Sequence, residues 1–187
     1  MEYWDLLDKD RNPLGVTHPR GRQYPMPPRT YHTVVTVLTV DQTGRVLLTR
    51  RAPTKGMYPS YWEITGGSGV AGEDSLTAAR RELFEETGID VSEEELTLLG
   101  TLREPSAFMD CYLCRLDAAG EDISVTLQEG ETVDDQWVSL YELENMIHRG
   151  ELPPPVAMRY GFVKTALADM LGEDAFLAPI PNKEDKT

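Results

Sequence analysis

The chain has 187 residues, of which 40% are hydrophobic, and this is enough for one domain with a normal apolar core. Its 32 acidic and 18 basic side chains give a formal net charge of −14. This charge argues against a nucleic-acid polymer or an anionic membrane as the main partner, because both need a basic surface.

The N-terminal region and the cysteines predict a reduced, cytoplasmic protein. The first twelve residues are charged from the second position onward and contain no apolar stretch of signal-peptide length. The sequence contains no run of about 18 apolar residues, so it predicts no membrane span. Cys111 and Cys114 are the only cysteines, and they stand three apart in a predicted strand, where side chains point to opposite faces. We therefore interpret them as small buried side chains rather than as a disulfide or a metal site.

The first part of the chain predicts a small β extension that leads into a linker. Residues 2–15 read as a strand, a turn at Asn12-Pro13 and a second extended piece. Residues 19–28 are rich in proline and predict a loop. The expected boundaries are 1–28 for the N-terminal extension and linker, 29–175 for the main domain, and 176–187 for a tail.

The main domain mixes strands and helices. Residues 31–40 are β-branched and predict a long strand, and the turn DQTG predicts that residues 45–51 return beside it as a hairpin. Residues 156–171 carry apolar positions at helical spacing. The other predicted elements are a short strand at 62–65, a glycine-rich turn, a helix at 75–87, an antiparallel pair at 95–104 and 107–117, a polar loop at 125–135, a strand at 136–140 and a short helix at 141–150. The mixture predicts an α+β fold, with an α/β/α arrangement around a mixed β-sheet.

The helix over residues 75–87 has clear ends and one apolar side. Asp74 or Ser75 can cap its N-terminus, and Gly88 can end it. At about 100° per residue, one side is apolar. The residues on that side are Leu76, Leu83 and Thr87, with Ala79 and Phe84 beside them. This side is expected to pack on the sheet.

Three glutamates, Glu82, Glu85 and Glu86, fall together on another face of this helix. Glu82 and Glu86 are an i,i+4 pair of like charge, which costs about 0.2–0.5 kcal/mol on an isolated helix. Arg81 can offset Glu85 but leaves that repulsion in place. A hard divalent cation such as Mg²⁺ would compensate it, because Mg²⁺ takes oxygen ligands. The alternative interpretation is a solvated acidic face.

The segment before the helix favours the metal interpretation. Residues 66–72 read GGSGVAG, so few side chains keep a ligand away from the backbone. The segment also leads into a helix N-terminus, where free N–H groups attract anions. A glycine-rich loop beside a carboxylate face is the composition of a metal–phosphate site.

The spacing of these residues resembles the Nudix box. The fixed positions run over residues 67–89 and are Gly67, Glu73, Arg81, Glu82, Leu83, Glu85, Glu86, Gly88 and Ile89. The pattern is long and gapped, and it is far more specific than a single short glycine motif. The surrounding order of predicted strands, roughly from Tyr31 to Gly150, also resembles the Nudix domain.

This resemblance implies a Nudix fold with a loop–helix–loop metal site, and a small-molecule diphosphate as substrate. The implied reaction is hydrolysis of a diphosphate bond in a nucleoside diphosphate linked to another group. By resemblance, Glu82, Glu85 and Glu86 are ligands of Mg²⁺, with Mn²⁺ as the alternative ion. A backbone carbonyl of Gly66 or Gly67 is a further ligand candidate.

The resemblance also assigns a structural pair and leaves the general base open. Glu73 and Arg81 look like an ion pair that fixes the loop against the helix; the alternative is two separate surface charges. Similar enzymes take the proton from the attacking water with a box glutamate, or with one from a later loop. The catalytic candidates are therefore Glu82, Glu85 and Glu129, the last slightly preferred over Glu131; each loop acid is otherwise a solvated side chain.

Substrate contacts are expected near the end of the second hairpin strand. Arg50 and Arg51 are neighbours there and point to opposite faces, so one of them is expected to reach a phosphate. The backbone at Gly67 is the other candidate phosphate contact, and Lys55 and Arg103 are weaker ones. Aromatic and sulfur side chains that could stack on a base, or else belong to the core, are Tyr58, Tyr61, Trp62, Phe108 and Met109.

Within the family, the N-terminal region and the hairpin resemble a branch related to isopentenyl-diphosphate isomerases. Isomerases of this type need a catalytic cysteine and a histidine after the tryptophan, but residues 62–67 read WEITGG and contain neither. His32 matches an isomerase metal-ligand position, and its alternative role is structural. The intact box therefore predicts a hydrolase. The other hypotheses are an isomerase and a module that binds a nucleotide without cleaving it, and a homodimer through the N-terminal extension is a further hypothesis.

Overall fold

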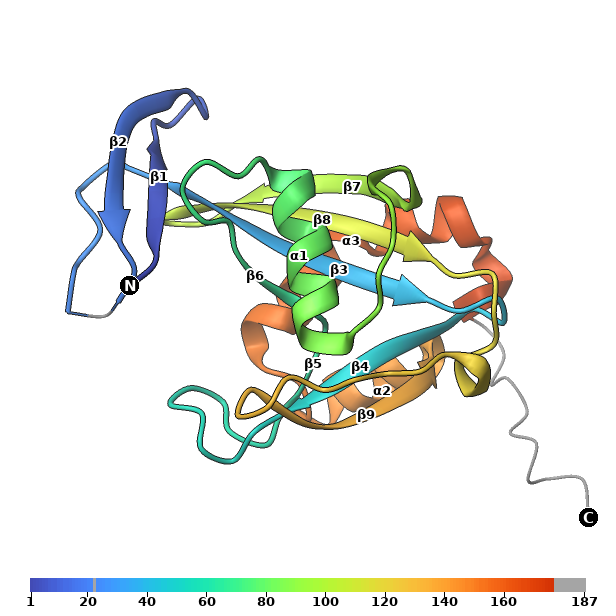
Figure 1. Ribbon diagram of the computed structural model, residues 1–187. Coiled ribbons are helices and arrows are strands. Elements are labelled where there is room, and N and C mark those ends of the chain that lie inside the picture. The colour runs from blue at the N-terminus through green and yellow to red at the C-terminus, as the bar shows by residue number, and fades with distance from the viewer. Residues whose placement is uncertain (22, 177–187) are drawn as a thin grey trace, which may run out of the picture.

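The computed structural model describes residues 1–21 and 23–176. Within that part of the chain, a seven-stranded mixed sheet forms the middle layer. Helix α1 (Ser75–Thr87) covers one face, and helices α2 (Leu140–His148) and α3 (Pro154–Leu171) cover the other (Figure 1). The predicted α+β class and the α/β/α sandwich are confirmed. The predicted tail lies outside the described residues beyond position 176.

The strands of this large sheet occur in the order β5-β4-β3-β8-β7, with β6 added to β3 and β9 added to β4. Their bounds are β3 His32–Val40, β4 Arg45–Arg51, β5 Trp62–Glu63, β6 Gly66–Ser68, β7 Leu96–Arg103, β8 Ala107–Arg115 and β9 Thr132–Ser139. Strands β3 and β8 run parallel, and β7 pairs antiparallel with β8. Short 3₁₀ turns lie at Glu93–Glu95, Gly120–Asp122 and Glu173–Phe176.

The predicted hairpin of residues 31–40 and 45–51 is wrong for most of its length. Strands β3 and β4 pair only at Val40 and Val46, near the turn. Beyond that point β6 lies antiparallel to β3, with Thr36 opposite Gly66. A Cβ atom at Gly66 would lie 2.5 Å from the Val35 carbonyl oxygen, so glycine permits this close pairing. The predicted glycine-rich turn therefore begins as a strand, and it opens the sheet where the box begins.

The predicted polar loop at 125–135 is also shorter than expected. Strand β9 begins at Thr132, and its pairing with β4 extends back to Arg51. Backbone pairing to a neighbouring strand overrides the polar character of these residues, which gave no local strand signal.

Each face of the sheet has its own apolar core. Leu48 and Leu113 lie in the core beneath α2 and α3, whereas Val37 and Leu83 lie in the core beneath α1. The two cysteines divide between them, because Cys111 faces the first core and Cys114 faces the second. Burial raises the pKa of each thiol to about 12. Both are free and buried, as the sequence predicts.

A second, two-stranded sheet extends from one end of the main sheet (Figure 1). It consists of β1 (Tyr3–Leu7) and β2 (Pro13–Pro19), which form an antiparallel hairpin. Leu7 and Tyr31 exchange backbone hydrogen bonds of 2.8 and 2.9 Å, which join the hairpin to the start of β3. In residues 1–21 and 23–176, no helix is both long and apolar enough to cross a membrane.

Candidate active site

Helix α1 begins and ends where the sequence predicts. The Asp74 side chain accepts a hydrogen bond from the Thr77 N–H at 2.8 Å, which caps the N-terminus. Gly88 has φ 71° and donates its N–H to the Phe84 carbonyl at 2.8 Å. The prediction that Phe84 lies beside the packed side is wrong, because its side chain is 53% exposed. One position after the fully buried Leu83, it points about 100° away from the sheet.

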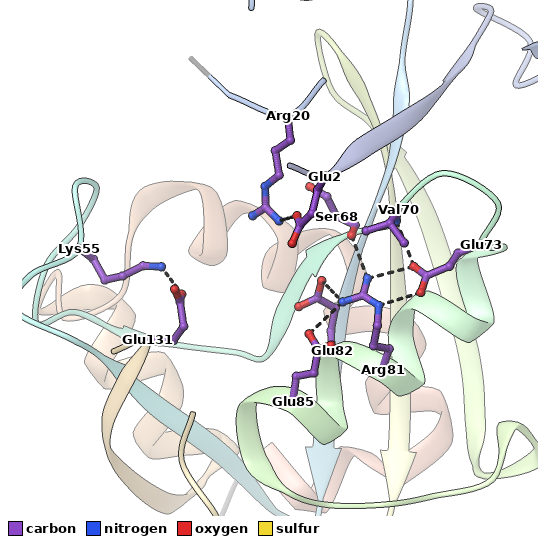
Figure 2. Close-up of polar contacts among 10 residues, drawn as sticks. All are labelled: Glu2, Arg20, Lys55, Ser68, Val70, Glu73, Arg81, Glu82, Glu85 and Glu131. Carbon is purple, nitrogen blue, oxygen red and sulfur yellow. Dashed lines mark hydrogen bonds and ion pairs between the residues drawn. The ribbon is translucent and has the colours of Figure 1, made fainter. Parts of the chain in front are cut away.

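The Glu73–Arg81 pair joins the glycine-rich loop to the helix. Two parallel bonds connect them, Nε–Oε1 at 2.8 Å and Nη2–Oε2 at 3.0 Å (Figure 2). Glu73 also accepts the Val70 N–H at 3.0 Å, and Arg81 donates to the Ser68 carbonyl at 3.1 Å. A bidentate pair that is largely shielded from solvent and bound to backbone on both sides holds geometry better than two surface charges. This arrangement favours the structural role over separate surface charges.

Glu82 is buried and lies against the glycine-rich loop. Its side chain is 8% exposed, and a Cβ atom at Gly67 would lie 2.2 Å from its carboxyl carbon. Only glycine leaves room at position 67 for this carboxylate. Arg81 Nη1 donates to Glu82 Oε1 at 2.9 Å and to Glu85 Oε2 at 3.0 Å (Figure 2). Glu85 is the most exposed of the three box glutamates on α1.

Glu86 and Glu63 of β5 are half-buried acids whose negative charges act on each other. Burial raises the pKa of Glu86 well above its ordinary value, and the negative charges of Glu63 and Glu82 raise it further. The Gly66 N–H donates to Glu86 Oε2 at 3.3 Å, which offsets only part of this effect. Burial also raises the pKa of Glu63, although Arg51 Nη1 lies 2.5 Å from its Oε2. Glu63 and Glu82 thus both repel the Glu86 carboxylate.

The donor set of this carboxylate cluster, Glu63, Glu82 and Glu86, fits a hard divalent cation. Carboxylate oxygens are the ligands that Mg²⁺ and Mn²⁺ prefer, and a cation would remove the repulsion that raises these pKa values. Among the described residues, however, no group of three or more His, Cys, Asp or Glu side chains already has an arrangement that could hold a metal ion. The chemistry of the residues fits, and their side chains would have to turn toward the ion.

The loop that supplies the predicted base lies across from α1. Glu131 forms an ion pair with Lys55, and the two side chains lie on the other side of the site from Glu82 and Glu85 (Figure 2). The Ala52 N–H donates to the Glu131 carbonyl at 2.8 Å, so the loop after β4 is bound to this loop. Glu129 is exposed and precedes Gly130, which has φ 78°. Lys55 therefore engages Glu131, and Glu129 is the more accessible acid.

Arg50 and Arg51 lie on opposite faces of β4. Arg51 is on the side of the carboxylate cluster, where it pairs with Glu63. Arg50 donates its Nε to the Ser60 carbonyl at 3.1 Å and lies over the Trp62 ring, 5.8 Å from its centroid. Arg50 also lines a surface pocket of about 330 Å³. The residues that line this pocket are Arg50, Ser60, Tyr61, Trp62, Gly150 and Glu151. Arg51 is thus the arginine of the pair that the fold brings to the cluster.

The remaining candidates for substrate contacts differ in their burial and in their neighbours. Phe108 and Met109 are buried, which places them in the core rather than at a base-stacking surface. Tyr58 and Tyr61 meet edge to face with ring centroids 5.7 Å apart in the loop after β4. Arg103 lies over the ring of Tyr31, 5.9 Å from the centroid, at the end of β7.

Two acids of the structure were not singled out by the sequence analysis. Glu63 belongs to the cluster, and Asp110 of β8 is 1% exposed and binds Arg11. Both stand between apolar neighbours in predicted strands, in WEI and MDC. A lone acid in an apolar strand is a usable signal, because a buried carboxylate needs a partner or a function.

The sequence is similar to that of several known proteins. Residues 30–158 match the family model described as NUDIX domain. The chain is 34% identical over 155 residues to an uncharacterized Nudix hydrolase of Listeria monocytogenes, with 82% of this chain and 89% of the relative covered. It is 28% identical over 162 residues to a prenyl-diphosphate phosphatase of Methanosarcina mazei, with coverage of 84% and 91%.

The similar proteins also include an isomerase. The chain is 28% identical over 151 residues to an isopentenyl-diphosphate Delta-isomerase of Brevibacterium linens, with 79% of this chain and 82% of the relative covered. Among solved structures, the protein DR0079 of Deinococcus radiodurans superposes with a TM-score of 0.69 at 22% identity, covering 87% of this chain and 99% of that one. This structural likeness supports the fold.

Proposed function

The chain belongs to the NUDIX domain family of hydrolases, and from this premise we propose that it uses Mg²⁺ to hydrolyse the diphosphate bond of a small, nucleoside-diphosphate-type substrate. The observation that carries this proposal is the carboxylate cluster. Glu63 and Glu82 each have one arginine partner, whereas Glu86 has no ion pair in the described residues, and burial and the charges of the other two acids raise its pKa. A structural acid cluster would be neutralised by the fold itself.

The residues divide the work as follows. Glu82 and Glu86 would hold the ion, with Glu85 turning from Arg81 toward it. Bound there, Mg²⁺ would neutralise the diphosphate and lower the pKa of a water molecule. Arg81 would keep Glu82 in place, and Glu73 would keep Arg81 in place. Glu129, exposed and without a cationic partner in the described residues, is our candidate for accepting the proton of the attacking water.

The isomerase alternative is not supported by the cysteines. Cys111 and Cys114 are the only two in the chain, and both are buried with their pKa raised to about 12. Neither thiol is accessible or ionised near neutral pH, so neither can exchange a proton with an allylic carbon. His32 is also unsuited to a metal site, because it is buried and stacked on Trp4 with ring centroids 4.0 Å apart.

The test is a screen for phosphate release with Mg²⁺. The panel contains nucleoside di- and triphosphates, nucleotide sugars, dinucleotides, isopentenyl diphosphate and a longer prenyl diphosphate, since one relative acts on the last class by name. We expect one class to be cleaved, and Glu86→Gln to reduce turnover at least about 100-fold. Glu94→Gln, which removes one exposed charge from the 3₁₀ turn after α1, is the matched control and should keep full turnover.

Besides an absence of turnover across the whole panel, two results would contradict the proposal. One is equal turnover in Glu86→Gln and the native protein. The other is conversion of isopentenyl diphosphate to its isomer without release of phosphate. The homodimer hypothesis stays a prediction for gel filtration; Tyr3, Leu14 and Val16 of the hairpin are exposed apolar side chains that a dimer would cover.

A further inference from the structure

The N-terminal hairpin is bound to the loop of the candidate site, although it lies outside the residues that match the family model. The Ala71 N–H donates to the Tyr3 carbonyl at 2.8 Å, and the Gly72 N–H donates to Asp5 Oδ2 at 2.7 Å. Both donors belong to the segment that connects β6 to α1. Strand β1 therefore borders the same loop that packs against Glu82.

This docking brings one cation of the hairpin to the candidate site. Arg20 directly follows β2, and its N–H donates to the Glu2 carbonyl at 2.9 Å. Its guanidinium pairs with Glu2, Nη1–Oε2 at 2.5 Å, and Figure 2 shows this pair on the same side of the site as Ser68 and Glu82. Burial raises the pKa of Glu82; Arg81 is the main positive charge that opposes this effect, and Arg20 is a weaker one.

Other cations near the cluster are already occupied. Arg81 donates to Glu73, to the Ser68 carbonyl and to two box glutamates. Arg51 donates to Glu63 and to the Met57 carbonyl. These bonds also fix the loops, so a substrate that displaced them would disturb the site.

Arg20 is held differently. In the described part of the chain, Glu2 is the one residue whose side chain binds its guanidinium, and the two side chains are 48% and 54% exposed. Exposed pairs of this kind contribute little to stability, so an anion that carries two or more charges can replace the Glu2 carboxylate. A planar guanidinium is also suited to bind phosphate oxygens in pairs.

We propose that Arg20 is a phosphate-binding residue that the N-terminal hairpin contributes to the active site, and that Glu2 occupies it until a diphosphate binds. The ligand class is the diphosphate group of the substrate, so this inference rests on the proposed function. It assigns the N-terminal hairpin a part in substrate binding, in addition to any structural part.

The experiment measures binding rather than turnover. Methylenediphosphonate, a diphosphate analogue whose bridge cannot be hydrolysed, is titrated calorimetrically into the protein with Mg²⁺ present. The variants are Arg20→Gln, Glu2→Gln and the double variant. Lys9→Gln is the matched control, because Lys9 is a 69% exposed cation of the same hairpin, and its one ion pair among the described residues is with its neighbour Asp10. Melting temperatures are recorded for all four.

We expect Arg20→Gln to weaken binding about three- to tenfold and Glu2→Gln to strengthen it, in line with a partly exposed charge-assisted hydrogen bond. The double variant should bind like Arg20→Gln, and Lys9→Gln like the native protein. The inference is overturned if Arg20→Gln binds within twofold of the native protein, or if Arg20→Gln and Glu2→Gln weaken binding alike, as a purely structural pair would.

The outcome can be separated from that of the hydrolase proposal. If the panel shows no turnover but the four affinities follow the expected order, Arg20 keeps its assignment and the hydrolase proposal fails. If turnover is found and lost in Glu86→Gln while Arg20→Gln binds normally, the hydrolase proposal stands and this inference fails.

Discussion

The buried carboxylate of Asp110 and the carboxylate cluster lie near opposite ends of α1, and they differ in how completely the protein neutralises them. Near the N-terminus, Asp110 accepts hydrogen bonds from Arg11, Thr101 and Ser75, with Arg11 Nη1 at 2.8 Å and Thr101 Oγ1 at 2.5 Å. Burial alone would raise the pKa of Asp110, but these donors lower it below its ordinary value. Near the C-terminus, the pKa of Glu86 is raised well above its ordinary value.

The difference teaches how a structural acid can be distinguished from a functional one. The Asp110 network is satisfied within the chain, and it fastens the hairpin to the sheet and to the first residue of α1. In the carboxylate cluster, Arg51 pairs with Glu63 and Arg81 pairs with Glu82, but Glu86 has no ion pair in the described residues. Under the proposed function, a divalent cation would supply the missing positive charge. Substitutions in the two places should accordingly have opposite effects on stability.

The largest effect is expected at the hairpin anchor. Arg11→Ala leaves Asp110 buried without its cation, which should lower the free energy of unfolding by about 3 kcal/mol. Urea unfolding followed by circular dichroism measures this change. The control Lys9→Ala breaks an exposed pair and should stay within about 0.5 kcal/mol of the native protein. A loss below about 1 kcal/mol for Arg11→Ala would show that the anchor is not structural.

His32, which the hairpin covers through Trp4, should make stability depend on pH. Burial lowers its pKa from 6.5 to about 4. Between these values the unfolded chain binds a proton that the folded chain does not, so stability falls as pH falls. Between pH 6.5 and pH 4.5, the free energy of unfolding of His32→Phe should fall by roughly 2–3 kcal/mol less than that of the native protein. Urea unfolding at pH 6.5 and pH 4.5 measures the difference, and parallel losses in both proteins would contradict the assignment.

A smaller effect of opposite sign is expected in the cluster. Glu86→Gln removes a buried charge that the fold does not neutralise, so without metal at pH 7.5 it should raise the free energy of unfolding by about 0.5–2 kcal/mol. The sign follows from the raised pKa. A carboxyl whose pKa is higher in the folded than in the unfolded state lowers the free energy of unfolding of the protein as the pH rises through the folded-state pKa. Destabilisation as large as that of Arg11→Ala would place Glu86 among the structural acids.

The sequence predicted the parts of this comparison that depend on local signals. Helix α1 is capped by Asp74 and ended by Gly88, and both residues directly flank the helix in the sequence. The spacing of the box identified Glu82 and Glu86 as candidate ligands. The Arg11–Asp110 contact joins residues 99 positions apart, so no local pattern contains it. Glu63 was overlooked for the same reason, because its meeting with Glu86 depends on how the sheet opens around β6.

The most direct test of the metal assignment is the melting temperature of the native protein as Mg²⁺ is added. A bound ion at 100 times its dissociation constant stabilises by about 2.7 kcal/mol, which corresponds to a rise of about 5 °C or more. We expect this rise in the native protein and in Glu94→Gln, and no rise in Glu86→Gln. An equal rise in all three proteins would mean that Mg²⁺ only screens the net charge of −14, and no rise in the native protein would mean that the cluster is not a metal site.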